Sequence, residues 1–257
     1  MKHNLQSMYG IAGNVAVITG AAGGIGKGIA EAMGELGVRL ALVDIREEPL
    51  QKIQEEFQQA GLEVMIVPTD ILSKESVQTM ARTVANDYGS IDILINCAGV
   101  SYLEEAVSFD EAKWDLVMGV NVKGTFLACQ AVGQYMLAHK KGRIVNFSSV
   151  RGLQGRARDM AYAPSKGAIN QLTKSLAIEW AQYNINVNAV APTFTLTEMN
   201  QAMLDDPETH QWVLNRIPKG RLCELDNLVG PTAFLCSPCA DFVTGQILYV
   251  DGGWTVA

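Results

Sequence analysis

The sequence lacks any long hydrophobic run. None of its 257 residues belongs to a stretch near the roughly 20 apolar residues that a membrane-spanning helix needs. The first residues, MKHNLQSMYGIAG, lack the apolar centre of a secretory signal. Basic residues are outnumbered 27 to 20 by acidic ones, for a net charge of −7, which argues against a nucleic-acid-binding surface. We therefore expect a cytoplasmic protein with no membrane or nucleic-acid partner.

Metal ligands are also scarce. The three histidines show no ligand spacing, and the five cysteines are an odd and scattered set. Cys236 and Cys239 form a lone C-x-x-C, which is a poor zinc site without a second pair or nearby histidines. We expect no metal, and reduced thiols of the kind found in cytosolic proteins.

The chain also lacks repeats, low-complexity stretches and linkers, so we predict one domain over residues 1–257 with an N-terminal tail at 1–12. Hydrophobic residues make up 48% of the chain, which is enough for a large core. Strand-like apolar runs alternate with helical patterns. The runs lie at 15–18, 38–43, 63–68, 91–96, 142–147, 185–191 and 245–250. This alternation predicts an α/β fold, a doubly wound parallel sheet of about seven strands with helices on both faces.

A glycine-rich turn follows the first apolar run. Thr19, Gly20, Gly24 and Gly26 give the pattern T-G-x-x-x-G-x-G, and a helical pattern begins at once behind it. Strand, glycine turn and helix together direct backbone N–H groups and a helix dipole at a phosphate. The alternative is a tight connection that binds nothing.

Asp44 ends the second strand, where a carboxylate can accept hydrogen bonds from an adenosine ribose and repel a 2′-phosphate. It can also be an ordinary strand-end residue. The glycine turn holds no basic residue, although Arg46 lies close by. We therefore predict NAD as the cofactor and NADP as the less favoured one.

The other strand ends are also small or polar. They are Asp70-Ile71, Asn96-Cys97-Ala98-Gly99, Ser148-Ser149 and Pro192-Thr193. Ligands of parallel sheets bind beyond the carboxyl ends of the strands, so these residues are candidates for one site.

Tyr162 and Lys166 stand at positions i and i+4 of a predicted helix at 160–183, and therefore share one face. An ammonium group can lower the pKa of a neighbouring tyrosine toward neutrality, which makes the pair a proton acceptor for an alcohol. Ser149 is placed to orient the substrate oxygen. Surface helices contain Tyr-x-x-x-Lys by chance, but the coincidence with the glycine turn makes chance a poor explanation.

With these motifs, the chain resembles the short-chain dehydrogenase/reductase family from about Gly13 to Trp254. The resemblance implies a Rossmann-type fold. The resemblance implies that Asn121, Ser149, Tyr162 and Lys166 are catalytic. Asn121 would anchor a water, Ser149 and Tyr162 would contact the substrate, and Lys166 would hold the nicotinamide ribose. The implied cofactor-binding residues are Gly20, Gly24, Ile25, Gly26, Asp44, Asp70, Ile71, Asn96, Ala98, Gly99, Tyr162, Lys166, Pro192, Thr195 and Thr197. The family also implies a homotetramer or homodimer.

Two residues depart from the family's pattern. Cys97 replaces an asparagine, which removes one structural hydrogen bond, and Thr193 replaces a glycine after the sixth strand. Thr193 can narrow the substrate pocket or offer it a hydroxyl, or it can be a harmless change in a loop.

Three arginines, Arg151, Arg156 and Arg158, lie between Ser149 and Tyr162 in an otherwise acidic chain. Guanidinium groups suit a carboxylate or phosphate, so we take Arg156 and Arg158 as candidate substrate-binding residues with Thr193. They can instead be solvated or lie in a subunit interface. In having an Arg in this loop, the chain resembles the family's gluconate 5-dehydrogenase-like members. This resemblance implies that the substrate is a polyol, sugar acid or hydroxy acid. Residues 193–222 are predicted to be an irregular segment that covers this substrate.

Two other functions remain open from the sequence. A non-catalytic dinucleotide-binding regulator has the same fold, and so does an epimerase or dehydratase that keeps Tyr-x-x-x-Lys. The intact reactive residues favour an NAD(P)-dependent oxidoreductase.

Overall fold

The computed structural model describes residues 9–197 and 201–257, so Glu198–Asn200 of the predicted substrate cover and most of the predicted tail lie outside the described residues. The order of the elements follows the predicted alternation. The strands are β1 (Val15–Thr19), β2 (Arg39–Asp44), β3 (Val64–Pro68), β4 (Ile93–Asn96), β5 (Gly142–Phe147), β6 (Ile185–Pro192) and β7 (Ile247–Val250). The larger helices are α2 (Gly24–Glu35), α3 (Glu47–Gln59), α4 (Lys74–Tyr88), α5 (Glu111–Met118), α6 (Thr125–His139), α7 (Tyr162–Trp180), α9 (Pro207–Arg216) and α10 (Leu225–Cys236).

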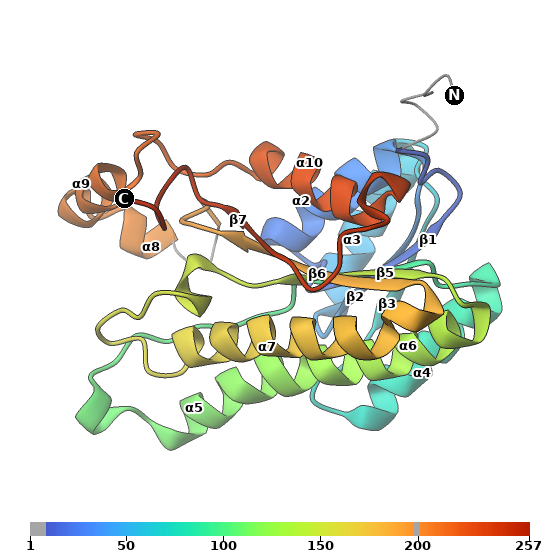
Figure 1. Cartoon of the computed structure of the whole chain (residues 1–257), viewed down its shortest axis with the longest axis horizontal. Helices are drawn as coiled ribbons and strands as arrows, with labels where there is room; N and C mark the ends of the chain where they lie inside the picture. Colours follow the sequence, from blue (N-terminus) through green and yellow to red (C-terminus); the bar gives the residue numbers. More distant parts are fainter. Residues whose placement is uncertain (1–8, 198–200) are drawn as a thin grey trace.

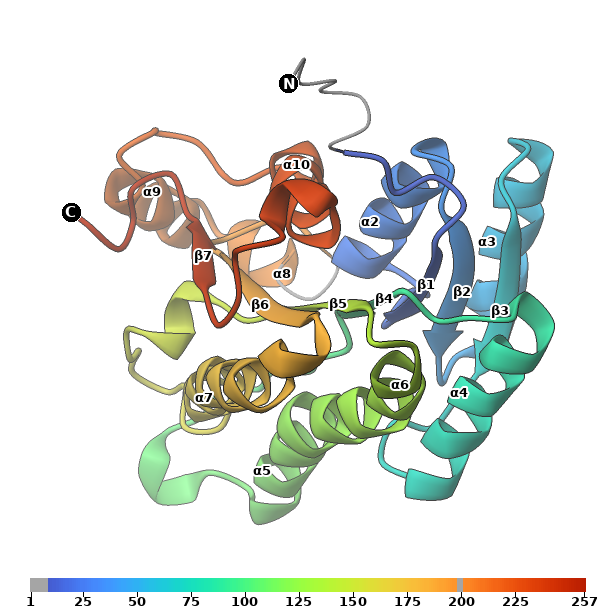
Figure 2. The ribbon, with the colours of Figure 1, turned by 45° about the vertical axis from the view of Figure 1, so that its right-hand side comes forward.

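The strands form one parallel sheet in the order β3-β2-β1-β4-β5-β6-β7. Helices α2, α3 and α10 cover one face, and α4, α6 and α7 cover the other (Figures 1 and 2). This confirms the predicted doubly wound sheet. The strand order reverses between β1 and β4, and the carboxyl ends of these two strands mark the position where such sheets bind ligands.

The apolar runs form strands because both of their faces are buried. All five residues of β1 and all eight of β6 are buried against the two helical layers. Ile11 is also buried in the core, so the part of the predicted tail that the structure describes contributes to packing. The stretch Glu111–His139 has the length and hydropathy of a membrane span, but 56% of its most apolar window is buried inside the protein, which accounts for its composition.

The segment 201–216 differs from its prediction, since it is helical instead of irregular. It contains the short helix α8 (Gln201–Leu204) and the three-turn helix α9, which begins at the N-cap Asp206 with Pro207 in its first turn. Val213 and Ile217 pack with Trp254 in a small separate core. Figure 1 shows α8, α9 and the C-terminus together at one end of the molecule.

Candidate active site

The glycine turn lies against the end of β4. Gly20 has a φ of +69°, and a Cβ there would come within 2.7 Å of the Ala98 Cα atom. A Cβ at Gly26 would lie 2.2 Å from the Gly20 carbonyl oxygen. Only glycine fits at these two positions. The turn and the Asn96–Gly99 segment thus form one surface at the reversal of the sheet.

Asp44 is fixed against this turn. Its Oδ2 accepts a hydrogen bond from the Ala22 N–H at 3.1 Å, and its Oδ1 accepts from the Arg46 N–H and Nε, at 3.1 and 3.2 Å. The carboxylate is therefore held where the ribose was predicted, with one cation beside it.

One of the predicted threonines lies beside the turn. A Cβ on Gly24 would lie 3.9 Å from the Thr197 Cγ2, whereas Thr195 forms a bridge with Cys223. The cofactor contacts of Pro192, Thr195 and Thr197 stay predictions.

Other predicted cofactor residues have structural partners. Asn96 donates from Nδ2 to Asn146 Oδ1 at 2.9 Å, and Asn146 donates to Thr173 at 2.9 Å, so this side chain lies in a buried network beneath the site. The Asp70 carboxylate accepts from the Leu72 N–H at 2.9 Å. Ile71 packs against Gly124, where a Cβ would lie 2.7 Å from its Cγ1.

Ser149, Tyr162 and Lys166 are brought together between β5 and α7. Ser149 and Lys166 are only 8% and 6% exposed, and Ser149 forms a hydrogen bond with Tyr162. The Lys166 Nζ donates to the Phe147 carbonyl oxygen at 2.7 Å and lies 5.4 Å from the centroid of the Tyr162 ring. The reactive residues predicted from spacing therefore share one buried site.

The protonation of this pair differs from the prediction. Burial raises the pKa of Tyr162 to about 12, against smaller lowering effects of the Ser149 hydrogen bond and the Arg151 charge. Burial also lowers the pKa of Lys166 to about 8. The expected lowering of the tyrosine pKa by Lys166 is absent, because removal from water disfavours both charged forms.

Asn121 lies in a π-helix over Gly119–Gly124, between α5 and α6. Its amide clamps Val100 in both directions, with Oδ1 accepting at 2.9 Å and Nδ2 donating at 3.0 Å, and Nδ2 also donates to Ser165 Oγ at 2.9 Å. The side chain is thus committed to structure. Its main-chain carbonyl oxygen accepts from Thr125 Oγ1 at 2.8 Å, and the predicted contact with a water stays a prediction. A π-helix is common at functional sites and leaves no trace in the apolar pattern.

The three arginines separate in space. Arg158 has a φ of +66°, is exposed, and pairs with Glu105 at 3.3 Å. Arg156 instead turns toward α8, with Nη2 3.4 Å from the Met203 sulfur. Arg151 lies beside Phe194 and Trp254. Arg151 and Arg156 are half-buried, so the loop offers two inward guanidinium groups and one outward group.

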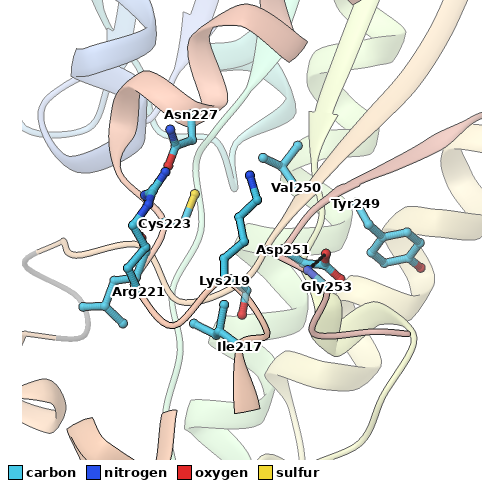
Figure 3. A pocket seen from close by; sticks show the side chains of 12 residues that line it. Ile217, Lys219, Arg221, Cys223, Asn227, Tyr249, Val250, Asp251 and Gly253 are labelled. Carbon is cyan, nitrogen blue, oxygen red and sulfur yellow. Dashed lines mark hydrogen bonds between the residues drawn. The ribbon is translucent and has the colours of Figure 1, made fainter. Parts of the chain in front are cut away.

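Thr193 is buried, and its hydroxyl has no hydrogen-bond partner in the described part of the chain. It borders a cavity of about 440 Å³ between the segment 217–223, α10 and the end of β7 (Figure 3). In this view Arg221 reaches Asn227, to which its Nη1 donates at 2.8 Å, and Lys219 rises between them and Val250. The cavity is not lined by Ser149, Tyr162 or Lys166.

Comparisons with known proteins agree with this geometry. A family model described as enoyl-(acyl carrier protein) reductase matches residues 20–255. The chain is 34% identical to the 5-keto-D-gluconate 5-reductase of Escherichia coli, over 98% of this chain and 100% of that protein. It is 38% identical to the NAD-dependent glycerol dehydrogenase of Listeria innocua, over 96% of each. The chain belongs to the short-chain dehydrogenase/reductase family.

A solved member of this family extends the comparison. The gluconate 5-dehydrogenase of Burkholderia cenocepacia, in complex with NADP and tartrate, superposes with a TM-score of 0.96 at 35% identity, over 99% of this chain and 100% of that one. As a member of the short-chain dehydrogenase/reductase family, the chain is an oxidoreductase that uses NAD(P). Relatives with bound NADP mean that the comparisons do not make NADP the less favoured cofactor, so the predicted ranking of NAD above NADP rests on Asp44 and the glycine turn alone.

Proposed function

We propose that this protein is an NAD-dependent short-chain dehydrogenase/reductase that interconverts a secondary alcohol and a ketone on a small polar substrate. The observation that carries the proposal is the meeting of Ser149, Tyr162 and Lys166 in one buried site beside the glycine turn. A serine and a tyrosine joined by a hydrogen bond offer two oxygen contacts to one substrate oxygen.

The residues fit a dinucleotide. Gly20 packs closely on Ala98, and α2 begins directly after the glycine turn, so the N–H groups of its first turn would be directed at a phosphate bound there. Asp44 would accept hydrogen bonds from the adenosine ribose and repel a 2′-phosphate, which supports NAD over NADP. Tyr162, Lys166, Pro192, Thr195 and Thr197 would surround the nicotinamide end. When bound, the nicotinamide supplies the acceptor or donor of the hydride.

Each reactive residue has a distinct role in proton transfer. Ser149 holds the substrate oxygen in place. Tyr162, protonated at neutral pH because its pKa is about 12, donates its phenolic proton when a ketone is reduced. For the oxidation of an alcohol the phenol first loses that proton, and the phenolate then accepts the proton of the alcohol. Lys166, with a pKa of about 8, exchanges protons near physiological pH and can resupply the site. The main-chain carbonyl of Asn121 would anchor the water that connects Lys166 to solvent.

The substrate class is supported by the relatives and by the loop that follows Ser149. The names of the relatives include a glycerol dehydrogenase and a gluconate 5-dehydrogenase, so a polyol, sugar acid or hydroxy acid of similar size suits the site. Arg156 faces the Met203 sulfur and the Thr193 hydroxyl has no partner among the described residues, so both are candidates for substrate contacts, whereas Arg158 pairs outward with Glu105. Closure of the segment 193–222 over the substrate would exclude water from the transfer.

We also infer association into a homodimer or homotetramer in the cytoplasm. Large apolar side chains are exposed along the long helices on one face of the sheet, and burying them would favour association. They are Trp114, Leu116, Phe126, Ile178 and Tyr183.

The test is a set of initial rates with NAD⁺ and with NADP⁺ on simple secondary alcohols, neutral polyols, sugar acids and 2- and 3-hydroxy acids. Turnover with NAD⁺ that releases NADH in solution supports the proposal. A cofactor that stays bound and shows no net reduction while the substrate changes configuration would instead indicate an epimerase. NADH binding with no turnover on any compound would indicate a regulator.

A further inference from the structure

Two guanidinium groups lie on one aromatic ring beside the reactive residues. The central carbons of Arg151 and Arg156 lie 5.8 and 5.9 Å from the centroid of Phe194. Arg151 also lies 5.4 Å from the centroid of Trp254, and Trp254 is held by a hydrogen bond from its indole N–H to Gln154 at 2.9 Å. Stacking on aromatic faces fixes the plane of a guanidinium group while leaving its N–H edge available.

The hydrogen-bonding capacity of both groups is largely unused. Arg151 Nη2 is buried and has no hydrogen-bond partner among the described residues, and Nη1 makes one long bond to the Gly155 carbonyl oxygen at 3.3 Å. Arg156 Nη2 faces the Met203 sulfur, a weak acceptor. A buried N–H of a charged group left without an acceptor costs free energy, which an incoming anion would offset.

The charge around the two arginines is unbalanced. Neither forms an ion pair in the described ranges 9–197 and 201–257. Burial and repulsion by the Arg156 charge lower the pKa of Arg151, and burial and repulsion by the Arg158 charge lower the pKa of Arg156 against the opposing charge of Asp159. Arg216 adds a third positive charge, 5.0 Å from the Trp254 centroid. In the described part of the chain, the only carboxylate whose charge stabilises the charged form of Arg151 is Asp159, and its Oδ1 already accepts a hydrogen bond from the Ala163 N–H at 3.1 Å. A half-buried excess of positive charge in a protein of net charge −7 favours an anionic ligand.

The arginine pair is tied directly to the reaction site. The backbone N–H of Arg151 donates to Ser149 Oγ at 3.1 Å, in the short turn Val150–Gly152. The same turn thus fixes the position of the Ser149 hydroxyl, which orients the substrate oxygen. It also fixes the backbone from which the Arg151 side chain extends. An anion bound by Arg151 would belong to the same substrate as the reacting carbon.

We propose that Arg151 and Arg156, stacked on Phe194, bind the carboxylate of the substrate, which makes hydroxy acids and their keto acids the preferred substrates over neutral polyols. This inference rests on the proposed function and narrows its substrate class. It assigns to Arg151, rather than to Arg158, the role of partner to Arg156. It also gives the covering segment a part in specificity, since Phe194 begins that segment and Met203 lies within it.

The experiment compares acids with alcohols that differ only in the carboxylate. The pairs are gluconate with glucitol, galactonate with galactitol, and glycerate with glycerol. For each pair, kcat/KM is measured in the wild type, in Arg151→Gln, in Arg151→Lys and in the surface control Arg82→Gln. We expect the wild type to prefer the acid of at least one pair, and Arg151→Gln to lose about 10- to 100-fold on that acid through KM. The paired alcohol should change by less than about threefold, and Arg151→Lys should fall between.

A binding measurement separates this inference from the proposed function. In the presence of NADH, the preferred acid should raise the Tm of the wild type and of Arg82→Gln but not that of Arg151→Gln. Oxidation of alcohols with no preference for any acid overturns the carboxylate site and leaves the dehydrogenase intact. Equal loss on acid and alcohol in Arg151→Gln makes the residue structural and also overturns it. If the acid binds in a way that depends on Arg151 but is not turned over, the carboxylate site is supported and the proposed oxidoreductase function is rejected.

Discussion

Lys166 donates a hydrogen bond from its ammonium group to the carbonyl oxygen of Phe147, 2.7 Å away at the end of β5. The side chain is 6% exposed, and burial lowers its pKa to about 8 from an ordinary value of 10.5. A single carbonyl does not replace the lost hydration of the ammonium group. The protein therefore maintains this charge at a cost in stability, as expected for a residue kept for its chemistry.

Replacing Lys166 by methionine should remove turnover and stabilise the protein at pH 7. The folded pKa lies below the unfolded one, so between about pH 8 and 10.5 the unfolded state binds more protons and stability rises with pH. Below pH 8 the full cost is present. We expect the free energy of unfolding of Lys166→Met to exceed that of the wild type by about 1 to 2 kcal/mol at pH 7. Urea denaturation at pH 7 and 9.5 measures the difference, which should shrink at the higher pH. A variant that is less stable at pH 7 contradicts the argument.

Tyr162 should give the two reaction directions different pH dependences. With a pKa of about 12 the phenol is protonated at neutral pH. Reduction, which takes a proton from the tyrosine, should be independent of pH from about 6 to 9, whereas oxidation should rise with pH throughout this range. Tyr162→Phe should lose about a thousandfold in kcat in both directions while NADH binding, followed by fluorescence, is retained. Turnover that persists in this variant would assign proton transfer to another group.

Much of the fold was predictable because strands buried on both faces are mostly apolar. β5 begins at Gly142 and ends at Phe147, the bounds that the sequence predicts, although Arg143 and Asn146 interrupt its apolar residues. The glycine turn was predictable for a related reason, since a Cβ at Gly20 or Gly26 would collide with backbone. The strands depend on the local sequence, and the glycine turn depends on space that only glycine fits.

The parts that were not predicted depend on contacts between distant segments. Helix α9 carries few apolar residues, and its Trp212 packs on Trp254 at 5.9 Å, so its apolar pattern gave no helical signal. The N-cap Asp206 and the following Pro207 were the only local signal for its start. Arg156 and Arg158 are two residues apart, but a left-handed backbone at Arg158 sends it to Glu105. Proximity in sequence therefore suggested a pair that the chain does not form.

Asp44 should control the choice between NAD and NADP. Its side chain is 9% exposed and directly contacts the glycine turn and Arg46. Asp44→Asn removes the charge that repels a 2′-phosphate, keeps an oxygen for the Ala22 N–H, and releases Arg46 to pair with the phosphate. We expect the ratio of kcat/KM for NADP to that for NAD to rise at least about tenfold. The double variant Asp44→Asn with Arg46→Gln should lose most of this gain. An unchanged ratio in Asp44→Asn would place the discrimination elsewhere.

Thr193 offers a test of whether its departure from the family's glycine matters. Its hydroxyl is buried, and its Oγ1 finds no acceptor or donor within the described residues, while its backbone N–H donates to Val250 at 3.4 Å. An unsatisfied buried hydroxyl costs about 1 to 3 kcal/mol, and valine has nearly the same shape without it. Thr193→Val should therefore raise the Tm of the protein.

The same variant should weaken ligand binding if the hydroxyl serves the nicotinamide or the substrate. We expect KM for one of them to increase about tenfold in Thr193→Val, because a hydrogen bond formed only in the complex is lost. Thr193→Ser keeps the hydroxyl and should retain the wild-type KM, which controls for the change in packing. A higher Tm with unchanged KM values in Thr193→Val would mean that the threonine only narrows the pocket, and Thr193→Gly should then accept a bulkier substrate.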